Sequence, residues 1–237
     1  MSQPTHPIPA PPRDVARAVE YLARPREKRS FHTVLEAGAL LGGSHRTLTT
    51  KAECTADGVA LELHIELGGG HIRESFRAVA AADGLRAQTM TRTVTDASGE
   101  VVREERAEFS GRVLALPKAM YPEVMLPFML GWFPLDGRRR SLYAWINDRF
   151  VARVYFESGK RTRVQLPCGR IDAIECVMYP DLEDWVPIGA TLSHMAKPFM
   201  PKYRMWIEPV SPFTLLRFEG PYGPPGAPEF VIEMQQR

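Results

Sequence analysis

Cysteine is scarce in this sequence: the 237 residues contain only Cys54, Cys168 and Cys176, with no Cys-x-x-Cys pair among them. A sparse, odd count fits neither a disulfide-stapled scaffold nor a zinc site. The chain also lacks an apolar run of the roughly 20 residues that cross a bilayer, and its first thirty residues lack the apolar core of a signal peptide. We therefore expect a reduced, cytoplasmic protein with no metal site and no integral membrane association.

An excess of charge of one sign is missing as well. Thirty Lys and Arg residues against 28 Asp and Glu residues give a formal charge of +2, too balanced for a protein that follows phosphate backbones, so no nucleic-acid partner is expected. The chain contains no GxGxxG, and Leu41-Gly42-Gly43-Ser44 lacks the lysine of a phosphate-binding loop. No GxSxG nucleophile motif is present. These absences predict that no cofactor takes part in the function.

Proline is abundant, with 21 residues in 237 against a usual share of about 5%, which disfavours a helical bundle. Apolar and polar residues alternate most clearly over 59–67, a pattern typical of a half-buried strand. Further strand-like runs lie near 71–80, 85–95, 100–110, 141–156, 161–166, 170–179, 203–208, 213–219 and 229–234. The sequence therefore predicts a mostly β protein: an antiparallel curved sheet or half-barrel. Residues 1–12 are expected to form a flexible proline-rich tail and residues 13–237 a single domain.

Two segments are expected to be helical. Asp14 is a suitable N-cap for a short helix with Val15, Val19 and Leu22 on one stripe. Residues 114–136 are strongly apolar and rich in methionine, yet four prolines interrupt them. They are expected to form a buried helical connector that plugs one end of the sheet. A mobile lid over an apolar cavity and a segment that docks on a membrane surface are the alternatives.

Hairpin register predicts which side chains face inward, because a shift of one residue exchanges the two faces of a strand. A three-residue loop around Ser158-Gly159 would pair Phe156 with Thr162 and is expected to be a turn. The glycines at 68–70 require an even loop, which places Glu74 on the core side of its strand. A carboxylate there must be paired with an interior arginine, such as Arg92 or Arg217, or must contact a ligand.

The C-terminal third carries a recurrent pattern. A strand that begins at Arg161 leads into Leu166-Pro167-Cys168-Gly169, and an aromatic strand over 203–208 is followed by a proline turn and a strand over 213–219. Over roughly residues 140–235 this resembles the bacterial half-barrel proteins of the lipoprotein-carrier (LolA/LolB-like) type and their uncharacterised relatives. The resemblance implies a sheet wrapped around an apolar cavity that a short helical segment stoppers. It also implies binding of lipid-like molecules, or cofactor-free enzymatic activity as in a few relatives. A lipobox cysteine and an export signal are missing, so transport of lipoproteins is not carried over.

From these features we expect the protein to bind a hydrophobic small molecule in the concavity of the sheet. The alternative is a cofactor-independent enzyme, such as an isomerase, cyclase or dehydratase, with Glu74 as general acid or base. In the binding protein Glu74 would instead orient the ligand. The expected lining residues are Met125, Phe128, Met129, Trp132, Trp145 and Trp206. The sequence predicts neither the ligand's identity nor the oligomeric state.

Overall fold

The computed structural model describes residues 4–11, 16–25, 46–67, 69–109, 117–147, 150–181, 202–221 and 229–236. Within them the chain forms strands almost throughout. The strands are β1 (Ala16–Pro25), β2 (Arg46–Thr55), β3 (Gly58–Leu67), β4 (Gly70–Ala81), β5 (Gly84–Asp96), β6 (Val101–Glu108), β7 (Met120–Pro122), β8 (Arg140–Asn147), β9 (Phe150–Leu166), β10 (Gly169–Pro180), β11 (Tyr203–Ile207), β12 (Leu215–Pro221) and β13 (Glu229–Met234).

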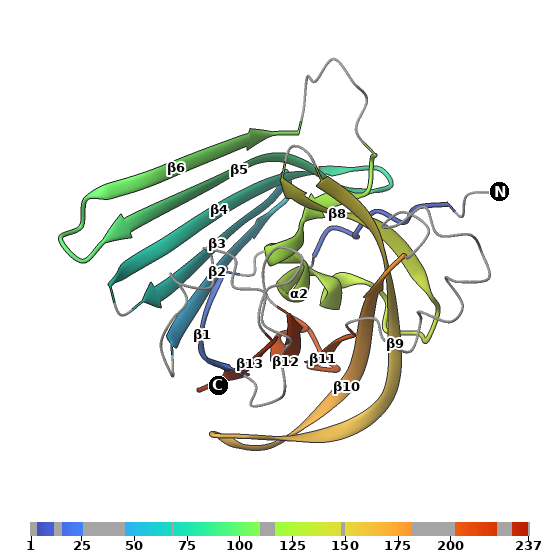
Figure 1. Ribbon diagram of the computed structural model, residues 1–237. Helices are drawn as coiled ribbons and strands as arrows, with labels where there is room; N and C mark the ends of the chain where they lie inside the picture. The colour runs from blue at the N-terminus through green and yellow to red at the C-terminus, as the bar shows by residue number, and fades with distance from the viewer. Residues whose placement is uncertain are drawn as a thin grey trace, which may run out of the picture.

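All of these strands belong to one curved, open sheet in the order β6-β5-β4-β3-β2-β1-β13-β12-β11-β10-β9-β8-β7. Every neighbouring pair is antiparallel except β7 and β8. The two halves of the chain are joined where β1 pairs with β13. Figure 1 shows β1 to β6 as one broad wall and β9 and β10 as long arms that curl around the opposite side. The predicted mostly β, curved antiparallel sheet is confirmed.

The register of β3 and β4 determines which of their side chains point to the inward face of the sheet. Leu61 lies opposite Phe76 and Leu63 lies opposite Glu74, as the even loop at the glycines predicts. The apolar members of these pairs are at most 1% exposed, and Glu74 is only 3% exposed. Strict alternation therefore places a carboxylate among core side chains, because no register can move Glu74 outward without also moving Phe76.

The N-terminal helix predicted from Asp14, Val15, Val19 and Leu22 is wrong. Residues 16–25 form β1, which lies between β2 and β13. Val19, Tyr21 and Ala23 point inward and are almost completely buried. The backbone of this segment pairs with two neighbouring strands. That strand pairing outweighs the helical spacing of apolar residues in the local sequence.

The turn predicted at Ser158-Gly159 is also wrong. The chain runs straight through this pair as part of β9, and its hairpin partner is β10, reached through the turn at Pro167-Cys168. The pairing register between β9 and β10 changes at this position, because Arg161 lies opposite Ile174 but Ser158 lies opposite Cys176. Gly159 allows this bulge, since a Cβ there would lie 2.9 Å from the carbonyl oxygen of Glu175. The Ser-Gly signal marks a β-bulge in a continuous strand.

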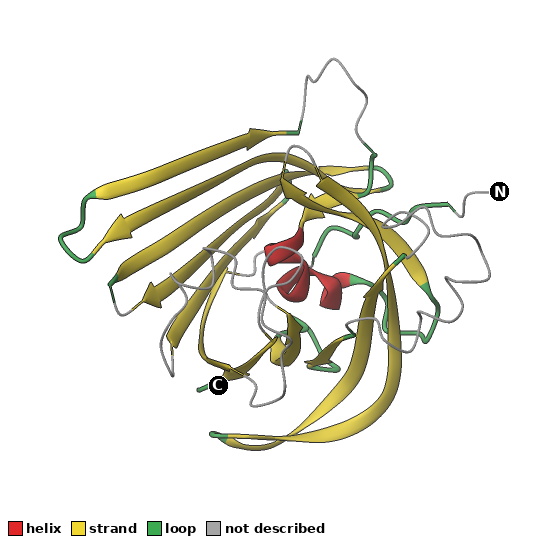
Figure 2. Ribbon diagram, viewed as in Figure 1, coloured by secondary structure: helices red, strands yellow, loops and turns green. Residues whose placement is uncertain are grey.

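The helical plug is present in the interior. It consists of η1 (Glu123–Met125), α2 (Leu126–Met129) and η2 (Leu130–Trp132), and Figure 2 shows it in red, surrounded by the yellow strands. Met125, Leu126, Met129 and Leu130 have no exposed surface. Gly131 is essential to its seating, because a Cβ there would lie 2.5 Å from the carbonyl oxygen of Phe213. No helix in the described part of the chain is long and apolar enough to cross a membrane.

Residues 4–11 bridge the two ends of the open sheet. The backbone N–H of His6 donates to the carbonyl of Ser141 in β8, and the N–H of Leu85 in β5 donates to the carbonyl of Ile8 at 2.7 Å. The Tyr121 hydroxyl accepts from the N–H of Ile8 at 2.9 Å and donates to the carbonyl of Leu85 at 2.8 Å. Ile8 is fully buried. Residues 4–11 are therefore packed into the structure, while residues 1–3 and 12 of the tail expected over 1–12 lie outside the described residues.

Candidate functional site

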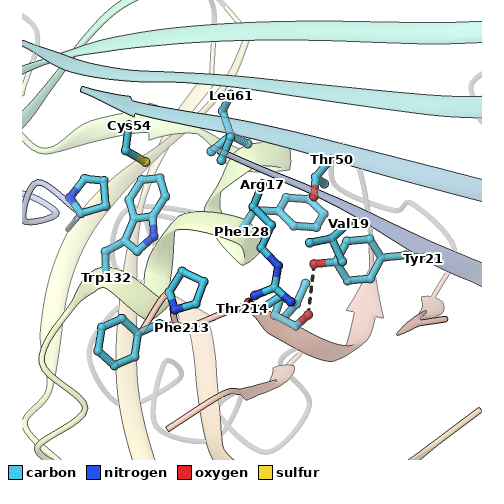
Figure 3. Close-up of a pocket in the computed structure, with 14 residues that line it drawn as sticks. Arg17, Val19, Tyr21, Thr50, Cys54, Leu61, Phe128, Trp132, Phe213 and Thr214 are labelled. Carbon is cyan, nitrogen blue, oxygen red and sulfur yellow. Dashed lines mark hydrogen bonds between the residues drawn. The ribbon is translucent and has the colours of Figure 1, made fainter. Parts of the chain in front are cut away.

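A small hollow lies between the plug and the strands β1 to β3, and we call it the slot. Figure 3 shows the side chains that surround it. Its cavity volume is about 50 Å³. Because one water molecule needs roughly 10–15 Å³ of such volume, the slot in this state admits only a group of a few atoms. Its apolar wall is formed chiefly by Val19, Tyr21, Ala52, Leu61, Phe128 and Trp132.

One end of the slot is polar. The Arg17 guanidinium donates to the Thr214 hydroxyl and lies 3.5 Å from the buried carboxylate of Glu208. The Tyr21 hydroxyl donates to the carbonyl of Leu215 at 3.1 Å, and burial raises the pKa of Tyr21 above its ordinary value. The charge of Arg17 is therefore balanced by Glu208, and this end of the slot presents dipoles and a neutral ion pair.

Cys54 is the sulfur-bearing residue of the slot wall. Burial raises the pKa of its thiol to about 11. Since the thiolate is the reactive form of cysteine, Cys54 is a poor nucleophile at neutral pH and acts here as a small apolar side chain.

A mainly polar row of residues crosses the concave face beside the slot, with Leu63 as its one apolar member. Strand register places Thr50, Leu63, Glu74, Arg92 and Glu105 side by side from β2 to β6. Arg92 Nε donates to Glu74 Oε1 at 2.6 Å, and Arg92 Nη1 lies 3.5 Å from Glu105 Oε2. Arg92 was one of the two partners that the sequence suggested for Glu74. The second oxygen, Glu74 Oε2, is buried and has no hydrogen-bond partner among the described residues.

The plug contributes a second, partly buried acid to this region. Glu123 begins η1 and receives a hydrogen bond from the Tyr203 hydroxyl of β11. Burial, and after it the negative charge of Glu74, raise the pKa of Glu123 to about 8, while Arg92 and the hydrogen bond from Tyr203 oppose the shift. Burial and the neighbouring Glu123 raise the pKa of Tyr203. The raised pKa therefore favours the protonated form of Glu123 at neutral pH.

The expected lining residues separate into two groups. Phe128 and Trp132 line the slot, and Met125 and Met129 lie fully buried on the same plug. Trp145 packs edge-to-face on Phe109, with ring centroids 5.3 Å apart, and Ala144 beside it on β8 is buried on the other face. Trp145 thus belongs to the contact between the ends of the sheet and does not line the slot.

Trp206 also lies away from the slot. Its neighbour Met205 has no exposed surface, and Tyr203 on the same face as Met205 contacts the plug, so Trp206 points outward. Its ring lies between the guanidinium groups of Arg204 and Arg217, at 4.9 and 5.5 Å from the ring centroid. Cation–π contacts of this kind stabilise the outer surface of the sheet.

The described residues contain no group of three or more His, Cys, Asp or Glu side chains arranged to hold a metal ion. The site therefore consists of an apolar slot, a polar end with the Arg17–Glu208 ion pair, and two carboxyl groups, of which Glu74 is buried on β4 and Glu123 belongs to the plug. The fold and this interior define the class of the protein: a barrel-like, plugged antiparallel sheet.

Comparison with solved structures supports that class. The fold is similar to a β-barrel-like protein of a domain of unknown function (DUF1849) from Brucella abortus, with a TM-score of 0.55, 11% identity, and coverage of 94% of this chain and 97% of that one. At this identity the likeness shows the fold alone. It supports a bacterial barrel-like fold, whereas a specific relationship to lipoprotein carriers stays a prediction.

Two further structures match more weakly. One is described as an exported protein with a YmcC-like fold from Bacteroides fragilis (TM-score 0.32, 13% identity, 98% of this chain and 97% of that chain). The other is described as a lipoprotein from Parabacteroides distasonis (TM-score 0.32, 9% identity, 99% of both chains). We base no inference on either. No family model matches the chain, and a search of curated proteins finds no matching sequence.

Proposed function

We propose that the protein binds a hydrophobic small molecule in the concavity of its sheet, with the apolar part of the ligand entering the slot. The observation that carries this proposal is the composition of the slot wall. One side is the sheet, with Val19 and Leu61, and the other is the short helical plug, which contributes Phe128 and Trp132 (Figure 3). A cavity between a scaffold and a short segment can enlarge without breaking the scaffold.

Binding of a drug-sized ligand requires the slot to enlarge. Sites for drug-sized ligands occupy roughly 300–1,000 Å³, far above the cavity volume of about 50 Å³. The plug is held largely by apolar contacts, and no side chain caps any of its three helical turns. Burial of apolar ligand surface contributes about 25 cal/mol of favourable free energy per Å². A ligand that displaces the plug therefore replaces the plug's apolar contacts with apolar contacts of its own.

Filling the slot tests this function. In Ala52→Phe an aromatic ring is added to the inward face of β2, where Ala52 lines the slot. Ala18→Phe adds the same ring to an exposed position of the adjacent strand β1 and is the matched control. The readout is the fluorescence increase of the neutral dye N-phenyl-1-naphthylamine. We expect the wild type and Ala18→Phe to bind the dye equally and Ala52→Phe to bind at least about tenfold more weakly. Equal binding by all three proteins, or none by the wild type, contradicts the proposal.

The alternative function is cofactor-independent catalysis on a hydrophobic substrate. Two carboxyl groups in different environments favour it: Glu74 is in an ion pair with Arg92, and the pKa of Glu123 is raised, so Glu123 can serve as an acid. Lifting the plug would have to expose Glu74 to the substrate, since Glu74 Oε2 has no contact with solvent. Glu74→Gln would abolish turnover and spare ligand affinity in an enzyme, whereas in a binding protein it changes affinity alone and no product forms.

A further inference from the structure

A closed ring of three hydrogen bonds joins the N-terminal segment to the base of the plug. The backbone N–H of Ile8 donates to the Tyr121 hydroxyl at 2.9 Å, that hydroxyl donates to the carbonyl of Leu85 at 2.8 Å, and the N–H of Leu85 donates to the carbonyl of Ile8 at 2.7 Å. All three residues are completely buried. Tyr121 lies in β7, just before Glu123, where the plug begins. The ring therefore fixes the point from which the plug extends.

Residues 4–11, which we call the strap, also reach the slot. Pro11 is one of the residues that line the slot, together with Trp132 of the plug. The strap thus holds the base of the plug through Ile8 and borders the slot through Pro11. Release of the strap would free Tyr121 and open part of the slot wall in one movement.

The composition of the strap suits a segment that can leave its place and return. Ile8 is its single buried residue. Four of its eight residues are prolines, which have no backbone N–H and lose little conformational freedom when they become ordered. A displaced strap therefore has fewer backbone donors to satisfy than a displaced strand. Its fit is specific all the same, because a Cβ on Gly84 would lie 2.7 Å from the carbonyl oxygen of Ile8.

We propose that the strap is a latch: while Ile8 is seated in the ring the plug is held and the slot stays small, and release of the strap lets the plug move so that the ligand enters. This inference rests on the proposed ligand binding and names the segment that controls it. The apparent association constant of the ligand then equals the intrinsic constant multiplied by the fraction of open molecules. A substitution that weakens the latch should consequently strengthen binding.

Two substitutions weaken the latch at residues that do not line the slot. Ile8→Ala removes most of the buried side chain, and Tyr121→Phe removes the hydroxyl that joins Ile8 to Leu85. Stopped-flow fluorescence with N-phenyl-1-naphthylamine measures the association rate, and an equilibrium titration measures the affinity. We expect both variants to bind the dye at least about fivefold faster and about fivefold more tightly than the wild type. A merely structural role would leave both quantities unchanged or lower them.

Two control variants accompany these. Ala10→Ser, at an exposed position of the same strap, should bind the dye as the wild type does. Trp206→Leu controls for a general loss of stability, because Trp206 packs between Arg204 and Arg217 on the outer face of the sheet. It should lower the free energy of unfolding without a gain in dye affinity.

Hydrogen exchange followed by mass spectrometry tests the latch on the unaltered protein. The backbone N–H groups of His6, Ile8 and Leu85 donate hydrogen bonds while the strap is seated, so they should be protected from exchange in the free protein. Saturating dye should increase exchange in the peptide that contains His6 and Ile8. Exchange in β3, which pairs with β2 and β4, should not increase.

The outcomes separate the latch from the proposed function. If the wild type binds the dye but neither folded strap variant binds it faster and more tightly, the latch is overturned and hydrophobic binding stays intact. Dye binding that leaves exchange at His6 and Ile8 unchanged has the same consequence. Failure of the wild type to bind the dye contradicts the proposed function itself, and the latch with it. The exchange measurement uses the wild type, so the test holds even where a substitution impairs folding.

Discussion

Arg92 Nε donates a hydrogen bond of 2.6 Å to Glu74 Oε1, joining neighbouring strands on the concave face of the sheet. Glu74 is 3% exposed, whereas the Arg92 side chain is 32% exposed. The pair is thus asymmetric: removal of the arginine leaves a carboxylate inside the protein, while removal of the carboxylate leaves an arginine that can still reach water.

This asymmetry predicts unequal costs. Arg92→Met should lower the free energy of unfolding by about 3 kcal/mol, and Glu74→Gln by about 1 kcal/mol. Urea unfolding at neutral pH measures both values, and the double variant should be more stable than the sum of the single effects implies. Equal losses for the two single variants would show that Glu74 is not confined by the core.

Glu123 should make stability depend on pH. Its pKa is raised from 4.5 to about 8 in the folded protein, so the folded state binds more protons than the unfolded state between these values. The contribution of Glu123 to stability is therefore complete below about pH 4.5 and declines as pH rises towards about 8, by at most about 1.4 kcal/mol per unit. Urea midpoints of wild type and Glu123→Gln across this range should converge or cross as pH increases. A difference that stays constant with pH would mean that Glu123 ionises normally.

The three cysteines should react at very different rates. Cys168 is exposed in a turn, while burial raises the pKa of Cys54 to about 11 and that of Cys176 to about 12. Iodoacetamide should therefore modify Cys168 first, as mass spectrometry of tryptic peptides can follow. Bound N-phenyl-1-naphthylamine should slow the modification of Cys54 in the slot and leave that of Cys168 unchanged. Protection of Cys168 instead would locate the dye elsewhere.

Trp206 should matter for stability and not for binding. Its ring packs between Arg204 and Arg217 on the outer face, so Trp206→Leu should cost about 1–3 kcal/mol in unfolding free energy. Affinity for the naphthylamine dye should remain within about twofold of the wild type. A large loss of dye affinity in a stably folded Trp206→Leu protein would return Trp206 to the ligand site that its sequence pattern first suggested.

Local patterns in the sequence predict much of the sheet because one buried face imposes a period of two. The even loop at residues 68–70 is sufficient to place Glu74 inside and to suggest Arg92 as its partner. The errors arise where the partner strand is distant. Residues 16–25 become a strand through pairing with β13, more than 200 positions away, and Gly159 is a bulge only because β10 packs across it.

The candidate site was harder to predict for the same reason. Phe128 and Trp132 follow from the apolar segment, but Arg17 and Thr214, nearly 200 residues apart, meet only in the fold. Glu123 did leave a signal, since it is the single charged residue between Ala119 and Leu135. An isolated acid in an apolar helical plug is either paired or protonated, and which of the two holds depends on Glu74 in a remote strand.

Native mass spectrometry of freshly purified protein, before and after addition of N-phenyl-1-naphthylamine, tests the central claim most directly. We expect the wild type to carry one small apolar molecule, from the cell or from the added dye, and Ala52→Phe to carry none. Bare wild-type protein after incubation with the dye, or equal occupancy in the two proteins, would contradict the proposal that the slot beneath the plug receives a hydrophobic ligand.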